Sequence, residues 1–279
     1  MSVEKNTDSH GFIDSHCHFD FAVFDKHRLD LWSLCRENNI QHLLIPGVHP
    51  DQWKTSYELT RALAGVKFAV GVHPWWIAKL DDKHLNIKGL SPSLLRQLGR
   101  NSQRASCVAI GECGADKTIA TNFELQLMIL EQHIHCACET DLPIIIHVRQ
   151  SQNETLRLLT RFKPARGGVI HGFTGSLHLA RQYWALGFYL GVGGSITYAR
   201  ANKTREALAK MPLESLLLET DAPDMPLQGF QGAPNSPLKI INIARALADL
   251  RHETIENIAR QTTENAHQLF NLTPANSLT

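Results

Sequence analysis

The sequence lacks any hydrophobic run long enough to span a membrane, which needs about 20 apolar residues. Its first ten residues are polar and contain no apolar core of a secretory signal peptide. The six cysteines form no Cys-x-x-Cys pair, and several fall inside expected strands or helices, so they are typical of reduced thiols and not of a disulfide framework. We therefore expect a cytoplasmic protein that does not associate with membranes.

An excess of charge of one sign is also absent. The 28 basic and 27 acidic residues give a formal net charge of +1, so any contact with nucleic acid depends on a local basic patch. No low-complexity segment, Ser/Gly-rich linker or short repeat marks a domain boundary. We expect a single domain over residues 11–272 between a polar N-terminal tail (1–10) and a C-terminal tail (273–279). Nothing in the sequence indicates an obligate protein partner.

What the sequence does contain is a regular alternation of short apolar runs with longer amphipathic segments. The apolar runs are rich in β-branched residues, and their nearly continuous hydrophobicity is typical of strands buried on both faces of a parallel sheet. Eight such runs begin at Gly11, His42, Lys67, Cys107, Pro143, Gly167, Phe188 and Ser215. Segment 122–141 has apolar residues at helical spacing, and two more helices are expected at 236–250 and 252–270.

Eight strands alternating with helices predict an α/β fold, a (β/α)8 TIM barrel with extra C-terminal helices. The length of 279 residues is usual for such a barrel. A doubly wound open sheet is the competing topology, but the Gly-rich first turn that accompanies it has no counterpart here. We therefore favour the barrel.

The first apolar run ends in two histidines, within the stretch GFIDSHCHFD. If the strand continues through them, His16 and His18 point to the same face, because side chains alternate along a strand. A divalent cation is the simplest partner that favours two neutral imidazoles side by side. The alternative is a pair of surface histidines at the end of a strand.

Further metal-ligand residue types follow other expected strands, at the end where the active sites of barrels gather. The six candidates for a metal site are His16, His18, Glu112, His147, His171 and Asp221. Six ligands exceed the needs of one tetrahedral ion and fit two divalent ions bridged by a carboxylate and a water. Glu112 is the expected bridge, with His16, His18 and Asp221 at the first ion and His147 and His171 at the second.

The ligand types and the charge balance limit which ions and which substrates suit the site. Mixed imidazole and carboxylate ligands suit zinc, manganese or iron, and suit magnesium less well. Two divalent ions bring more positive charge than Glu112 and Asp221 neutralise, so the site favours an anionic substrate such as a phosphate ester over a neutral amide.

Six motifs in order carry a family resemblance that extends from about Gly11 to about Phe270. They are DSHCH (14–18), GVHP (71–74), AIGECGAD (109–116), PIIIHVR (143–149), HGFTGS (171–176) and LLLETDAP (216–223). The sequence resembles the TatD-type metal-dependent hydrolases of the amidohydrolase superfamily, and its second half is similar to the YjjV branch. The resemblance implies a two-metal barrel that hydrolyses phosphodiesters, often as a deoxyribonuclease. It also implies that Asp221 binds the first metal and accepts a proton from the attacking water.

Other residues receive supporting roles, each with an alternative. His73 is expected to act in catalysis or to contact the phosphate, and otherwise caps the turn before Pro74. Arg149 is expected to hold a phosphate, and otherwise forms a salt bridge at the barrel rim. Asp116 and Glu219 are expected to orient histidines or loops.

A second group of residues would contact nucleic acid. Arg200 and Lys203, with Arg205 and Lys117, are candidates for the local basic patch, and otherwise form a solvated helix start. Trp75 and Trp76 would stack on bases of a single strand, and otherwise fix a loop against the barrel.

The sequence thus predicts a hydrolase of the ester-bond class, a deoxyribonuclease that cleaves phosphodiesters through a metal-activated hydroxide. The expected catalytic residues are Asp221, Glu112 and His73, and the expected substrate is DNA or another phosphodiester. One alternative is an amidohydrolase-like enzyme that acts on a small phosphoester, amide or lactone. Another is a metal or nucleic-acid binding module without turnover.

Overall fold

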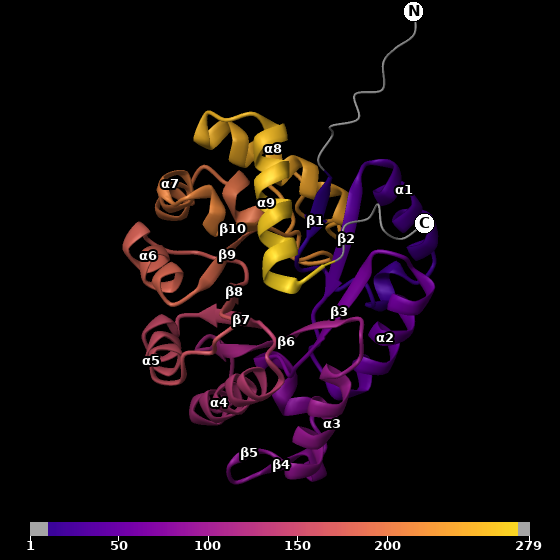
Figure 1. Cartoon of the computed structure of the whole chain (residues 1–279), viewed down its shortest axis with the longest axis vertical. Helices are drawn as coiled ribbons and strands as arrows, with labels where there is room; N and C mark the ends of the chain where they lie inside the picture. Colours follow the sequence, from indigo (N-terminus) through magenta and orange to yellow (C-terminus); the bar gives the residue numbers. More distant parts are fainter. Residues whose placement is uncertain (1–10, 273–279) are drawn as a thin grey trace, which may run out of the picture.

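A computed structural model describes residues 11–272, and its centre is a sheet of eight parallel strands (Figure 1). In order across the sheet the strands are β1 (Phe12–Asp14), β2 (Ile40–Ile45), β3 (Val66–Val70), β6 (Cys107–Asp116), β7 (Ile144–Arg149), β8 (Gly168–Ile170), β9 (Phe188–Val192) and β10 (Leu216–Leu218). The first and last strands meet, because the amide of Ser15 donates to the carbonyl of Leu218 at 3.0 Å. All eight expected strands are present, and the predicted (β/α)8 barrel is confirmed.

The helices surround the strands, as the amphipathic segments predict (Figure 1). They are α1 (Arg28–Glu37), α2 (Trp53–Ala62), α3 (Pro92–Ser102), α4 (Phe123–Thr140), α5 (Gln152–Phe162), α6 (Leu177–Ala185), α7 (Asn202–Lys210), α8 (Ile240–Arg251) and α9 (Ile255–Phe270). A short hairpin of β4 (Leu85–Asn86) and β5 (Gly89–Leu90) precedes α3. In residues 11–272 no helix is both long and apolar enough to cross a membrane.

Both faces of the strands are buried, which explains their continuous hydrophobicity. On β7, Ile144 and Ile146 belong to the large core between sheet and helices, whereas Ile145 belongs to a separate cluster inside the barrel. Successive side chains therefore alternate between the two cores.

The extra helix α9 covers the end of the barrel where the strands begin (Figure 1). Thr263 on α9 donates to the carbonyl of Gly11, before β1, and Asn265 donates to the carbonyl of Leu216 at the start of β10. Leu269 and Phe270 complete the cluster inside the barrel. With this end closed, the strands' carboxyl ends form the mouth that holds the candidate site.

Strand β1 is shorter than its apolar run predicts. Strand β1 ends at Asp14, so His16 and His18 lie in the irregular segment that follows it, and the argument from alternation along a strand was wrong for them. The two tails expected at residues 1–10 and 273–279 lie outside the described residues, so the division into one domain and two tails stays a prediction.

Candidate metal centre

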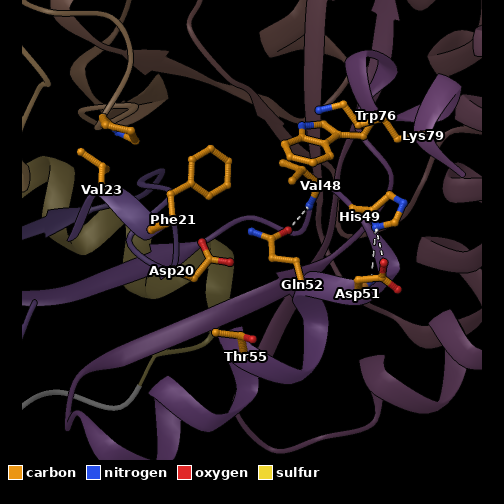
Figure 2. Close-up of a pocket in the computed structure, with 12 residues that line it drawn as sticks. Asp20, Phe21, Val23, Val48, His49, Asp51, Gln52, Thr55, Trp76 and Lys79 are labelled. Carbon is orange, nitrogen blue, oxygen red and sulfur yellow. Dashed lines mark hydrogen bonds and ion pairs between the residues drawn. The ribbon is translucent and has the colours of Figure 1, made fainter. Parts of the chain in front are cut away.

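Two neighbouring cavities open at the mouth of the barrel. The first has a volume of about 740 Å³, and its lining includes His18, His73, Glu112, His147, His171 and Asp221. The second, of about 690 Å³, adjoins it and shares Phe21, Val48 and Trp76 with it (Figure 2). The six predicted ligands therefore gather at the first cavity, with His16 buried beneath it.

Glu112 reaches the centre of this cluster because the register of β6 shifts between Ile110 and Cys113. The amide of Glu112 donates to the carbonyl of Gly47 at 2.8 Å, which ties β6 to the segment after β2. Gly71 permits this approach, since a Cβ on it would lie 2.6 Å from the carbonyl oxygen of Glu112. The glycine in GVHP thus makes room for the backbone of Gly111 and Glu112, from which the central carboxylate extends.

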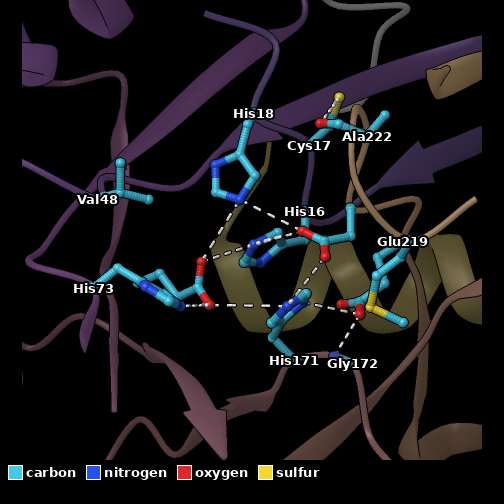
Figure 3. A network of polar contacts seen from close by, with 12 residues as sticks. His16, Cys17, His18, Val48, His73, His171, Gly172, Glu219 and Ala222 are labelled. Atoms are coloured by element: carbon cyan, nitrogen blue, oxygen red, sulfur yellow. Dashed lines mark hydrogen bonds and ion pairs between the residues drawn. The ribbon is translucent and has the colours of Figure 1, made fainter. Parts of the chain in front are cut away.

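The two carboxylate oxygens of Glu112 face different histidines. Figure 3 shows three histidines of the cluster, His16, His18 and His171, turned toward a common centre. Oε2 of Glu112 lies 3.0 Å from Nε2 of His16 and 3.8 Å from Nε2 of His18. Oε1 lies 3.3 Å from Nδ1 of His147 and 3.8 Å from Nε2 of His171. The carboxylate therefore stands between the two pairs of imidazoles assigned to the first and second ions.

Asp221 completes the first group. Its Oδ1 lies 3.5 Å from Nε2 of His16 and 3.4 Å from Nε2 of His18, and its Oδ2 lies 3.8 Å from Nε2 of His171. The residue adopts a left-handed backbone with φ of 56°, which is uncommon for a side chain other than glycine and is frequent at functional sites. Its amide donates to the carbonyl of His16 at 2.8 Å, so the backbone holds the two residues together.

His73 joins the cluster, but its hydrogen bonds favour a role other than metal binding. Its Nδ1 accepts from the amide of Trp75 at 3.1 Å. Burial lowers the pKa of His73 to about 4, so the ring is neutral and its proton lies on Nε2, 3.3 Å from Oε1 of Glu112. His73, Glu112 and His147 are close enough to form a metal site, yet a protonated Nε2 donates a hydrogen bond and does not ligate.

Two carboxylates contact His147 and His171, the histidines assigned to the second ion, on the ring nitrogens that face away from Glu112. Oε1 of Glu219 lies 3.0 Å from Nδ1 of His171 and accepts from the amide of Gly172. Oδ2 of Asp116 lies 3.6 Å from Nε2 of His147 and accepts from the indole of Trp75 at 2.7 Å. Such carboxylate–histidine pairs are typical of metal sites, because they fix the orientation of the imidazole.

The electrostatics combine deep burial with strong pairing. Burial would raise the pKa of Glu112, but the imidazoles of His73, His16 and His171 hold it well below its usual range. Burial would lower the pKa of His171, but Glu219, Asp221 and Glu112 raise it to about 10. Burial, together with His171 beside it, lowers the pKa of His16. Without a cation, the histidines of the cluster therefore differ in their affinity for a proton, which is high for His171 and low for His16.

These residues fit divalent cations. Ligand atoms of His16, His18 and Glu112 lie within 4.8 Å of one another, as do those of His16, His171 and Asp221. Nε2 of His16 and Oε2 of Glu112 face each other at 3.0 Å, yet among residues 11–272 neither of these buried atoms makes a hydrogen bond of regular geometry. Buried polar atoms normally make such bonds, so this pair points to a ligand. Imidazole and carboxylate donors suit zinc or manganese.

The remaining predicted residues separate into two sets. Arg149 lines the first cavity from the end of β7. Arg200 and Lys203 are not part of its lining; Arg200 lies over the ring of Tyr198, and Lys203 is exposed on the first turn of α7. Asp224 also lines the cavity and was missed, although it follows Asp221 by three residues in the motif ETDAPD.

Comparisons with known proteins identify the family of the chain. The profile of the family described as TatD related DNase matches residues 13–271. The chain is 38% identical over 262 residues to YjjV of Escherichia coli K12, which is named an uncharacterized metal-dependent hydrolase. The alignment covers 94% of this chain and 98% of that one. It is 36% identical to an uncharacterized metal-dependent hydrolase of Haemophilus influenzae Rd, over 93% of this chain and 99% of that one.

A solved structure shares the fold as well as the sequence. The crystal structure of E. coli K12 YjjV, described as a TatD homolog, superposes with a TM-score of 0.88 at 37% identity. The match covers 96% of this chain and all of that one.

Proposed function

Since the chain belongs to the TatD-related DNase family and is a metal-dependent hydrolase, we propose that it cleaves phosphodiester bonds, with DNA as the substrate, using two divalent cations. The observation that carries this proposal is the position of Glu112 between two pairs of imidazoles. One carboxylate that offers an oxygen to each side is the arrangement that a pair of ions needs. His16, His18, Asp221 and Glu112 would hold one ion, and His147, His171 and Glu112 would hold the other.

The preference for a phosphodiester follows from charge. Two divalent ions carry four positive charges, and Glu112 and Asp221 supply two negative ones, so the occupied site attracts an anion. When bound, divalent cations lower the pKa of water and stabilise negative charge on phosphoryl oxygens. Arg149 at the rim adds a further positive side chain for the substrate's phosphate.

Asp221 is the proton acceptor in this mechanism. Burial would raise its pKa, but His171, His18 and His16 lower it, so the carboxylate is ionised at neutral pH. Asp221 lines the first cavity, and the water that attacks phosphorus passes its proton to a carboxylate oxygen of Asp221. The hydrogen bond from the amide of Asp221 to the carbonyl of His16 holds the two residues together.

His73 donates a hydrogen bond and does not act as a general acid. Because its ring is neutral with the proton on Nε2, it stabilises a phosphoryl oxygen without delivering a full positive charge. The leaving oxygen takes its proton from solvent or from the protonated Asp221. This refines the expected role of His73 in catalysis.

The experiment is cleavage of a 3′-end-labelled single-stranded DNA oligonucleotide with Mg²⁺, Mn²⁺ or Zn²⁺, and with chelator. We expect metal-dependent cleavage that disappears in Glu112→Ala and is retained in Glu206→Ala, an exposed carboxylate on α7. A parallel panel contains a small phosphodiester, a lactone and a cyclic amide. Turnover of the lactone or amide without cleavage of any phosphodiester would overturn the proposal.

A further inference from the structure

The second cavity at the barrel mouth has a different character from the metal centre. Two walls are apolar or aromatic, with Phe21 and Val23 on one side and Trp76 and His49 on the other (Figure 2). Among the described residues, Lys79 is the cation in its lining, and its Nζ lies 3.8 Å from the centre of the Trp76 ring. With that charge on the aromatic face and Asp20 and Asp51 also in the lining, the cavity is unsuited to a phosphate.

The polar side chains at the back of this cavity are held by the protein itself. Gln52 accepts from the amide of Val48 at 2.7 Å through Oε1, which fixes its amide plane, and its side chain hydrogen-bonds to Asp20. Asp20 also accepts from Ser56 through Oδ2 at 3.0 Å. A fixed floor between apolar and aromatic walls suits a flat ring that packs through its faces.

The cavity is also continuous with the metal centre. Phe21, Val48 and Trp76 line both cavities, and the ring of Phe21 stacks on the candidate ligand His18 with centroids 4.7 Å apart. A substrate whose phosphate lies among the metal ligands can therefore place an adjoining group in the second cavity.

We propose that this cavity is a nucleobase subsite, which binds the base of a nucleotide adjoining the scissile phosphate. The base packs between the walls that carry Phe21 and Trp76. Stacking accepts every base, so the subsite binds a base without selecting among them. This inference rests on the proposed phosphodiesterase function and adds the chemical class of the substrate's neighbouring group.

The test compares a thymidine dinucleotide with two analogues in which one base or the other is replaced by a hydrogen, so the phosphate is unchanged. We expect one of the two analogues to raise KM about tenfold. The variant Thr55→Trp, in the exposed lining of the cavity on α2, fills the space and should bring the ratio between dinucleotide and analogue close to one. Lys54→Trp is the matched control, since Lys54 is the preceding residue, 84% exposed and outside the lining.

A second readout does not need hydrolysis. Thymidine carries no phosphate, so its binding, measured by NMR line broadening against 2-deoxyribose, reports the subsite alone. Thymidine binding that is weakened in Thr55→Trp, with no cleavage of any phosphodiester, would support the subsite and overturn the proposed function. Equal cleavage of dinucleotide and analogues, with no thymidine binding, would overturn the subsite and leave phosphodiester hydrolysis standing.

Discussion

Oε1 of Glu219 lies 3.0 Å from Nδ1 of His171, on the side of the ring that faces away from Glu112 and Asp221. The same oxygen accepts from the amide of Gly172, so the carboxylate is anchored to the backbone next to the histidine that it orients. Gly191 leaves room for it, because a Cβ there would lie 2.2 Å from Oε2 of Glu219. The pairing therefore sets both the direction of Nε2 and the basicity of the imidazole.

Replacing Glu219 by Gln should weaken metal binding while preserving the fold. The amide oxygen still accepts both hydrogen bonds, but the loss of negative charge makes His171 a poorer ligand. We expect the affinity for Zn²⁺ to fall about tenfold, the lower end for changes behind a metal ligand. Competition with a chromophoric chelator measures it, with the exposed Glu256→Gln as control. Unchanged affinity would show that Glu219 has only a structural role.

The contact between Trp75 and Asp116 yields a second prediction. The indole donates to Oδ2 of Asp116 at 2.7 Å although Trp75 is 52% exposed, and the same oxygen faces His147. Trp75→Phe keeps the ring and removes the donor, so Asp116 and His147 lose orientation. We expect kcat/KM for a phosphodiester to fall about 3- to 10-fold, as for the loss of one hydrogen bond worth about 1 kcal/mol at a half-exposed side chain.

The control for this variant is Trp184→Phe, because Trp184 packs against the cluster inside the barrel and is remote from the mouth. Equal activity of Trp75→Phe and Trp184→Phe would contradict the orienting role. A loss confined to nucleic-acid substrates, with small phosphodiesters cleaved normally, would instead indicate that Trp75 stacks on a base.

The sequence predicted the eight strands and the gathering of the ligands for a simple physical reason. Strands buried on both faces are apolar throughout, so a histidine or carboxylate at their ends stands out, and the carboxyl ends of parallel strands meet. His147 and Asp221 could be found in this way without any contact being known. The helices α8 and α9 followed from their spacing.

Other features depend on contacts that no local pattern encodes. The tautomer of His73 depends on the amide of Trp75, and the position of Glu112 depends on a shift in strand register and on Gly71 from a neighbouring strand end. Asp14 lies in the same motif as His16, yet it pairs with Thr220, 206 positions along the chain. Spacing alone could not distinguish this carboxylate from a metal ligand.

Metal binding should release protons. Without a cation the pKa of His171 is about 10, so the ring is protonated at pH 8, and a ligating nitrogen must give up its proton. We expect at least one proton to be released per protein at pH 8. The affinity for the metal should fall about tenfold for each unit by which the pH is lowered, for each proton displaced. Isothermal titration in buffers of different ionisation enthalpy measures the number.

The matched variant is His171→Asn, which should release about one proton fewer than the unmodified protein. It removes the titrating group and leaves the first set of ligands in place. Heats that do not depend on the buffer, in the unmodified protein, would contradict the assignment of a protonated His171 in the metal-free state.

Asp14 makes stability depend on pH in the metal-free protein. It is completely buried and accepts from the hydroxyl of Thr220 at 2.6 Å and from its amide at 2.9 Å, and burial raises its pKa to about 8 from an ordinary 3.8. In the unfolded chain the carboxyl ionises above pH 4, whereas in the folded protein it stays protonated to about pH 8. The contribution of Asp14 to the free energy of unfolding is therefore fully present below pH 4 and is lost as the pH rises to 8.

Asp14→Asn removes this dependence, because the amide is neutral at every pH and still accepts from the amide of Thr220. Urea unfolding at pH 5, 6.5 and 8 gives the free energy of unfolding for both proteins. We expect the unmodified protein to lose stability relative to the variant by at most about 1.4 kcal/mol per pH unit across this range. A difference that stays constant from pH 5 to 8 would mean that Asp14 is already ionised in the folded protein. The three hydrogen bonds to its oxygens, including one from the amide of His16, would then outweigh its burial.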